Sequence, residues 1–313
     1  MTHSQLYGVT DDSDTPDRSN EQAIIHRLVQ WGERQALVRA MLLTSSRTNP
    51  VAPVDALSDY DIIVVVTDIQ PYLLDGAWLE DFGELLVVYR DPVRHTYGCE
   101  TFTRVTHYQD GTKIDYSIWP TAILPQIVAQ PQLPDFLDIG YQILLDKDHL
   151  TDTLLPPTYM AYIPAPPTAE AYRTVIDEFF NDALYVAKYL WRDDLLPAKY
   201  SLDNVMKLEC LRQMLEWRME IAHGWSIKPG VNGRGLKRYV APDTWAGLER
   251  TYVGAGSSTN WDALFHTIEL FRSVAVEVGD QLGYAYPSAM EQRILAYLRK
   301  VQSLDRPATP LGG

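Results

Sequence analysis

The chain has 313 residues, which is enough for two domains of ordinary size, and its 46% hydrophobic and 22% charged residues are typical of a globular protein. It carries 27 Lys and Arg against 41 Asp and Glu, a net charge of −14. This charge argues against a polymerase or a general RNA-binding protein, because proteins that neutralise nucleic-acid phosphates need a basic surface. It favours a cationic partner, although acidity can equally serve solubility alone.

Cysteine usage and the apolar runs indicate the compartment. Cys99 and Cys210 are far apart in the sequence and form no CxxC pattern, so neither a disulfide framework nor a zinc knuckle is predicted. We see no basic-then-apolar leader and no apolar run of about 18 residues. We therefore expect a cytoplasmic protein that acts on neither membrane nor nucleic acid, and a monomer and a homodimer both stay open.

The first half of the chain predicts a mixed β-sheet flanked by helices. Residues 1–20 are polar and acidic and are expected to form a flexible lead. Apolar residues near the helical period predict a helix over 21–43; they are Ile24, Leu28, Trp31, Val38 and Leu42. The following elements are a β-branched strand at 60–67, a short helix near 75–82, a strand at 84–90, a hairpin of 101–109 and 112–119 around Asp110-Gly111, and a short helix near 121–129.

Five prolines between residues 155 and 168 mark a predicted domain boundary, because proline removes backbone donors and disfavours helix before it. We expect a catalytic domain over 21–155, an all-helical bundle over 156–303 and a flexible tail over 304–313. The predicted bundle helices are 169–193, 201–223, 242–252, 260–283 and 287–303. The fold class is thus α/β (α+β) with a helical second domain.

Three aspartates form the candidate metal site. Asp59 and Asp61 flank the start of the strand at 60–67, and side chains two residues apart in a strand point to the same side. Asp115 lies on the polar face of an alternating strand, 113–118. If the two strands are neighbours, the carboxylates converge, and hard oxygen ligands suit Mg²⁺. The alternative is that each aspartate is a solvated turn or surface residue.

Two stretches of the sequence could bind polyphosphate. Ser45, Ser46 and Arg47 precede the aspartate pair, and small hydroxyl residues with free backbone N–H groups can hold a triphosphate. The glycine-rich basic loop at 228–238 supplies Lys228 and Lys237 as cations for the phosphates. An ordinary solvated basic turn is the alternative for this loop.

The helix at 169–193 offers a candidate binding site for a cationic small molecule on the face opposite its apolar stripe. Glu178, Asp182 and Tyr185 follow one another at helical spacing. Acids beside aromatic rings suit guanidinium or ammonium groups through charged hydrogen bonds and cation–π contacts. The alternative is an ordinary solvent-facing stripe.

These motifs together resemble a known family. A Ser-rich turn, an Asp-x-Asp pair and a later strand aspartate are the pattern of the nucleotidyltransferase superfamily. Ser46-Arg-Thr-Asn-Pro50 with Asp59-Tyr-Asp-Ile62 more closely resembles the aminoglycoside 6-adenylyltransferases, the streptomycin-modifying enzymes, as do the runs at 185–192 and 282–287. The family usually has glycine where this chain has Ser45.

The resemblance implies an enzyme that transfers AMP from ATP to a hydroxyl of streptomycin, with release of pyrophosphate. The 6-hydroxyl is the first candidate for the position modified. It implies two Mg²⁺ ions held by Asp59, Asp61 and Asp115, with Asp115 as a metal ligand or a general base. Ser46 and Arg47 would contact phosphate. Two alternatives stay open: a nucleotidyltransferase with another small-molecule or protein acceptor, and a catalytically silent nucleotide-binding protein.

Overall fold

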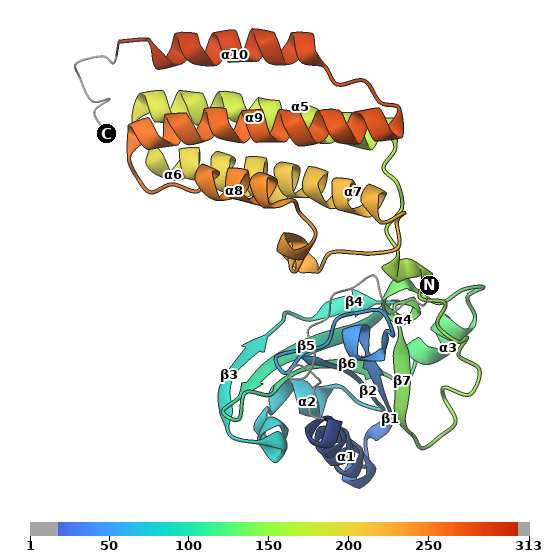
Figure 1. Ribbon diagram of the computed structural model, residues 1–313. Helices are drawn as coiled ribbons and strands as arrows, with labels where there is room; N and C mark the ends of the chain where they lie inside the picture. Colours follow the sequence, from blue (N-terminus) through green and yellow to red (C-terminus); the bar gives the residue numbers. More distant parts are fainter. Residues whose placement is uncertain (1–17, 306–313) are drawn as a thin grey trace. The chain divides into compact units, whose positions relative to one another are not determined.

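The computed structural model describes residues 18–305 and divides the chain into two compact units, the first ending at Tyr162 and the second beginning at Ile163 (Figure 1). This boundary lies inside the proline-rich segment 155–168. Each unit has its own hydrophobic core, as folding domains do. Of the expected flexible segments, 1–20 and 304–313, residues 1–17 and 306–313 lie outside the described residues, residues 18–20 belong to the first helix, and residues 304–305 follow the last one.

The first unit contains a mixed sheet with the strand order β3-β5-β6-β2-β1-β7, and β4 pairs with β5. Strands β2 and β6 run parallel, and the other described pairs are antiparallel. The strands are β1 (Val38–Thr44), β2 (Tyr60–Val66), β3 (Leu85–Arg90), β4 (Arg94–Thr96), β5 (Cys99–Tyr108), β6 (Lys113–Pro120) and β7 (Tyr141–Asp146).

Short and long helices cover both faces of this sheet. One face packs on α1 (Arg18–Arg34), α2 (Gln70–Leu74) and the 3-10 segment η3 (Ala77–Phe82), with Leu28 and Trp31 fully buried. The other packs on α3 (Ile123–Val128) and α4 (Asp135–Asp138). Burial on both faces explains why the central strands read as continuous apolar runs. The 3-10 segments η2 (Ser45–Thr48) and η4 (Met160–Tyr162) complete the unit.

The predicted hairpin is confirmed. β5 and β6 pair antiparallel on either side of Asp110-Gly111. Gly111 has φ of +87°, a conformation that glycine adopts without strain, and the Asp110 carboxylate accepts a hydrogen bond from the backbone N–H of Thr112 at 2.9 Å. A local turn signal thus correctly placed two strands of the sheet.

The predicted helix over 21–43 is wrong in its second half. Helix α1 ends at Arg34, and Val38–Thr44 form β1, between β2 and β7. Val38 and Leu42 are fully buried on opposite faces of the sheet. A strand buried on both faces has no polar–apolar alternation, so its apolar residues were assigned to the helical period of the preceding segment. Strands β4 and β7 and the short helix α6 were also missed.

The second unit is helical throughout its described part. Its predicted core stripe on α5 is confirmed: Ile176, Phe179 and Ala183 are fully buried, and Phe179 stacks on Phe271 with ring centroids 3.7 Å apart. The predicted helix over 201–223 is a π-helix in its first part. The elements are α5 (Ala169–Arg192), α6 (Leu195–Lys199), the π-helix η5 (Tyr200–Leu211), α7 (Arg212–Ala222), η6 (Val231–Gly233), η7 (Leu236–Arg238), α8 (Pro242–Thr251), α9 (Ser257–Leu282) and α10 (Ser288–Gln302).

Within residues 18–305, no helix combines the length and the apolar character that crossing a membrane requires.

Candidate functional site

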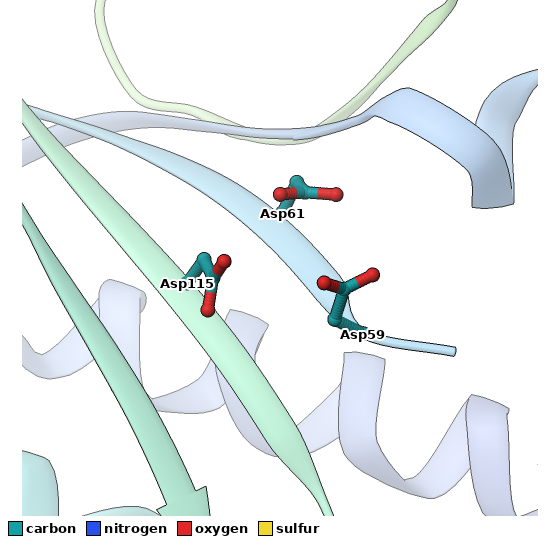
Figure 2. A group of neighbouring side chains, drawn as sticks. All are labelled: Asp59, Asp61 and Asp115. Carbon is teal, nitrogen blue, oxygen red and sulfur yellow. The ribbon is translucent and has the colours of Figure 1, made fainter. Parts of the chain in front are cut away.

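The three predicted aspartates lie together at one end of the parallel strand pair (Figure 2). Asp59 directly precedes β2, Asp61 is the second residue of β2, and Asp115 lies in β6. The parallel ladder sets Asp61 opposite Asp115, so register alone brings these two carboxylates side by side. One carboxylate oxygen from each aspartate lies within 4.8 Å of the others.

Alternation along the two strands explains why the aspartates share one side. Tyr60 and Ile62 of β2 are 4% and 1% exposed, while Asp61 between them is only partly buried. On β6, Ile114 and Tyr116 are likewise buried on either side of Asp115. The apolar neighbours hold each strand against the core, and the acids are left on the opposite side.

Burial and neighbouring negative charge raise the pKa of two of these carboxyls, Asp61 and Asp115. Burial, followed by the charges of Asp59 and Asp115, raises the pKa of Asp61 from 3.8 to about 6. Burial also raises the pKa of Asp115, although a hydrogen bond from Lys113 opposes this. Neighbouring anions in a partly buried site favour either protonation or a bound cation.

A lysine already bridges two of these carboxylates. The Lys113 ammonium lies 2.6 Å from Asp59 Oδ2 and 2.8 Å from Asp115 Oδ2. Burial by itself lowers the pKa of Lys113, but the hydrogen bonds and charges of Asp115 and Asp59 outweigh it, so this pKa is raised. Residues 113 and 115 share a face of the strand by alternation, but the sequence carries no signal of this bridge, which depends on strand pairing.

The site residues fit a divalent metal ion. Asp115 Oδ1 is buried and has no hydrogen-bond partner within the described structure, although its other oxygen is bonded to Lys113. A buried carboxylate oxygen without a donor is unfavourable unless a cation or a donor joins it. Carboxylate oxygens are the donors that Mg²⁺ prefers. Among the described residues, the three aspartates form the group that could share a metal ion.

The 3-10 turn η2, directly after β1, places Ser45 beside the cluster. Ser45 has φ of +65°, in the left-handed region where a non-glycine residue is strained. Its hydroxyl hydrogen-bonds to Asp61 and lowers the pKa of that carboxyl against the stronger effect of burial. The conformation explains physically why glycine would suit this position, and the hydroxyl is what serine adds. Ser46, next in η2, is half-buried.

Arg47 is engaged by the protein itself. Its guanidinium donates to the carbonyl oxygens of Asp59 at 2.9 Å and Ser58 at 2.5 Å, and it lies 3.8 Å from the centre of the Tyr60 ring. Its side chain is 5% exposed and also faces Glu21 at 3.5 Å. In this structure Arg47 anchors the segment that carries Asp59, where the sequence had suggested a phosphate contact.

The two predicted phosphate-binding lysines belong to the second unit and face acidic groups. Lys237 lies 3.5 Å from Glu249 and 5.2 Å from the centre of the Trp245 ring. Lys228 lies near enough to the carboxylates of Glu216 and Glu220 to lower the pKa of both, against the larger raising effect of burial. Both lysines are exposed, so their ammonium groups can reach other anions.

The predicted acceptor residues lie along α5 of the second unit. Glu178 and Tyr185 are exposed, and Asp182 is half-buried. The Tyr185 ring stacks on Tyr189 with centroids 6.2 Å apart, and the Lys188 ammonium lies 5.5 Å from each ring centre. The rings therefore already have a cation beside them, and a cationic ligand on this face would share them with Lys188.

Comparisons of the sequence with a family model and with curated proteins agree on one family. A family model described as streptomycin adenylyltransferase matches residues 18–301. An aminoglycoside 6-adenylyltransferase of Bacillus subtilis (strain 168) is 29% identical over 271 residues, covering 86% of this chain and 93% of the relative. One of Campylobacter jejuni is 28% identical over 270 residues, covering 86% of this chain and 91% of the relative. The crystal structure of an aminoglycoside 6-adenyltransferase from Bacillus subtilis has a TM-score of 0.44 and 24% identity, covering 91% of this chain and 99% of that one.

Proposed function

The chain belongs to the streptomycin adenylyltransferase family of nucleotidyltransferases. We therefore propose that it transfers AMP from Mg-ATP to a hydroxyl of streptomycin, with the 6-hydroxyl as the first candidate. The relatives named above are aminoglycoside 6-adenylyltransferases, which supports an aminoglycoside as the acceptor. The observation that carries the proposal is the convergence of three carboxylates at the end of the parallel strand pair.

In the proposed reaction the acceptor hydroxyl oxygen attacks the α-phosphorus of ATP, a P–O bond to the acceptor forms, and pyrophosphate leaves. Asp59, Asp61 and Asp115 would hold two Mg²⁺ ions. These ions would supply Lewis-acid stabilisation of the entering and leaving oxygens. The buried Oδ1 of Asp115, which lacks a donor in the described structure, is suited to be a ligand or to accept the hydroxyl proton.

We assign the turn η2, directly after β1, to holding the nucleotide in place. Ser45 positions Asp61 through its hydroxyl, and the half-buried Ser46 contributes its hydroxyl and backbone N–H to phosphate. We assign Arg47 to anchoring Asp59 rather than to binding phosphate, because its guanidinium donates to two backbone carbonyls beside Asp59 and pairs with Glu21. Lys228 and Lys237 remain our candidates for the outer phosphates.

We assign Asp182, Glu178 and Tyr185 to acceptor binding. Streptomycin carries guanidino groups, and carboxylates bind guanidinium through charge-assisted, often bidentate hydrogen bonds. The net charge of −14 raises the local concentration of such a cation. The compartment that we propose is the cytoplasm, in keeping with the free thiols of Cys99 and Cys210.

The direct test is release of pyrophosphate from ATP and Mg²⁺ with streptomycin, run beside the Asp59→Asn variant. We expect release that depends on streptomycin and a loss of about a hundredfold or more in the variant. Release with another acceptor from an antibiotic panel but not with streptomycin would replace the acceptor. ATP binding by calorimetry without turnover on any acceptor would indicate a silent nucleotide-binding protein.

A further inference from the structure

The space between Asp59 and Asp115 holds a cation supplied by the chain. The Lys113 ammonium reaches Asp59 Oδ2 at 2.6 Å and Asp115 Oδ2 at 2.8 Å, so one charged group bridges residues from two strands. Lys113 and Asp115 lie two residues apart on the same side of β6. The lysine is therefore built into the acidic cluster by strand geometry and not by chance contact of a surface side chain.

A divalent ion shared by Asp59 and Asp115 needs one oxygen from each carboxylate, and it competes with the ammonium for the space between the two residues. Magnesium coordinates carboxylate oxygen at about 2.0–2.1 Å and tolerates little distortion. An ammonium already between Asp59 and Asp115 occupies that space and repels a second cation at contact distance. Metal ion and ammonium therefore exclude one another from the position between these two residues.

We propose that Lys113 is the resident counter-cation of the metal-free site, which a divalent metal ion must displace in order to bind Asp59 and Asp115. This inference rests on the proposed function of the aspartate cluster as a metal site. The side chain of Lys113 is 25% exposed, so the ammonium has a route to solvent once it leaves the carboxylates. It remains attached through a long flexible stem, which lets it move without any change in β6.

Displacement has a consequence for the order of binding. A free ion that expels Lys113 gains two carboxylates but breaks two charged hydrogen bonds and leaves an ammonium without its partners. An ion that arrives with a polyphosphate brings new anionic oxygens, and the Lys113 ammonium can bind these in place of the two carboxylates. The lysine thereby lowers affinity for free metal and favours the metal–nucleotide complex.

The test measures Mn²⁺ binding to the full chain without nucleotide or acceptor, by the electron paramagnetic resonance signal of free Mn²⁺. Lys113→Met removes the charge and keeps the length, and Lys113→Arg is the matched control that keeps the charge. We expect Lys113→Met to bind Mn²⁺ about tenfold more tightly than wild type, or tighter still, since two charged hydrogen bonds no longer compete. Lys113→Arg should stay within about threefold of wild type.

Equal or weaker Mn²⁺ binding by Lys113→Met overturns the proposal, because a lysine that merely holds the carboxylates in place would weaken binding when removed. Thermal unfolding gives a second readout on the same proteins. The metal-free variant should melt below wild type, and saturating Mn²⁺ should narrow the gap. A gap that Mn²⁺ leaves unchanged or widens contradicts displacement.

A measurement on unaltered protein covers the case in which the variant fails to fold. Acetylation of Lys113, followed by mass spectrometry at constant pH, should rise when Mn²⁺ is added, because the ammonium is released from its carboxylates. Unchanged or reduced labelling overturns displacement. Streptomycin-dependent pyrophosphate release combined with unchanged or reduced labelling would overturn this inference and leave the proposed function standing. Increased labelling with Mn²⁺, without pyrophosphate release on any acceptor, would support displacement and contradict the proposed function.

Discussion

Replacing Glu220 with glutamine should stabilise the protein at alkaline pH but not at acidic pH. Glu220 lies on α7 and is 5% exposed. Burial, followed by the nearby charge of Glu216, raises the pKa of Glu220 from 4.5 to about 7, and Lys228 offsets only part of this. The folded protein therefore holds a proton on Glu220 that the unfolded chain releases at lower pH.

The direction and size of the effect follow from linkage. Below pH 4.5 Glu220 is protonated in both states, and its ionisation has no influence on stability. As pH rises from about 4.5 to about 7, the unfolded state gains from ionisation and the folded state does not, so stability falls; above pH 7 the loss is complete. A rise of about two and a half pKa units corresponds to about 3 kcal/mol, which is the upper limit.

Glutamine resembles the protonated acid in shape and carries no charge to desolvate. We expect Glu220→Gln to exceed wild type in the free energy of unfolding by about 1–3 kcal/mol at pH 8, and the difference to shrink towards zero near pH 4.5. Urea unfolding followed by far-ultraviolet circular dichroism at both pH values gives the difference, provided that the dependence on urea concentration stays unchanged.

A matched control removes one charge without removing a buried group. Glu269→Gln on α9 alters an exposed carboxylate, and we expect a stability change within about 0.5 kcal/mol at both pH values. The reasoning is refuted if Glu220→Gln is less stable than wild type at pH 8. It is also refuted if the two variants show the same dependence on pH.

The remaining predictions concern the candidate site. Asp115→Asn should reduce pyrophosphate release about a hundredfold to a thousandfold in steady-state kinetics, while its thermal midpoint shows that it is folded. Arg47→Met leaves two partly buried carbonyl oxygens without their guanidinium donor and should lower the free energy of unfolding by about 2 kcal/mol in urea, and a neutral result would argue against its anchoring role. Gly140→Ala should cost about 2 kcal/mol in the same assay, because φ is +143° and a Cβ atom would meet the carbonyl oxygen of Thr48 at 3.0 Å. Asp182→Asn should raise KM for streptomycin about tenfold with kcat little changed, and an unchanged KM would remove Asp182 from the acceptor site.

Features that depend on neighbouring residues could be predicted from the amino-acid order. The alternation around Asp61 and Asp115 predicted which side chains turn away from the core, and Asp110-Gly111 predicted the hairpin that carries β6. Helical periodicity predicted the long helices of the second unit and the buried stripe of α5. These patterns are local because side-chain direction in a strand or helix repeats within a few residues.

Features that require distant segments to meet could not be predicted in this way and follow from the fold. The sequence predicts helix for residues 38–43 of β1 because a strand buried on both faces carries no alternation, and only pairing with β2 and β7 defines the strand. The register of β2 on β6 sets Asp61 beside Asp115 and puts Lys113 within reach of Asp59. Such pairings depend on which strands become neighbours and in what register, and this is decided when separated apolar faces share one core.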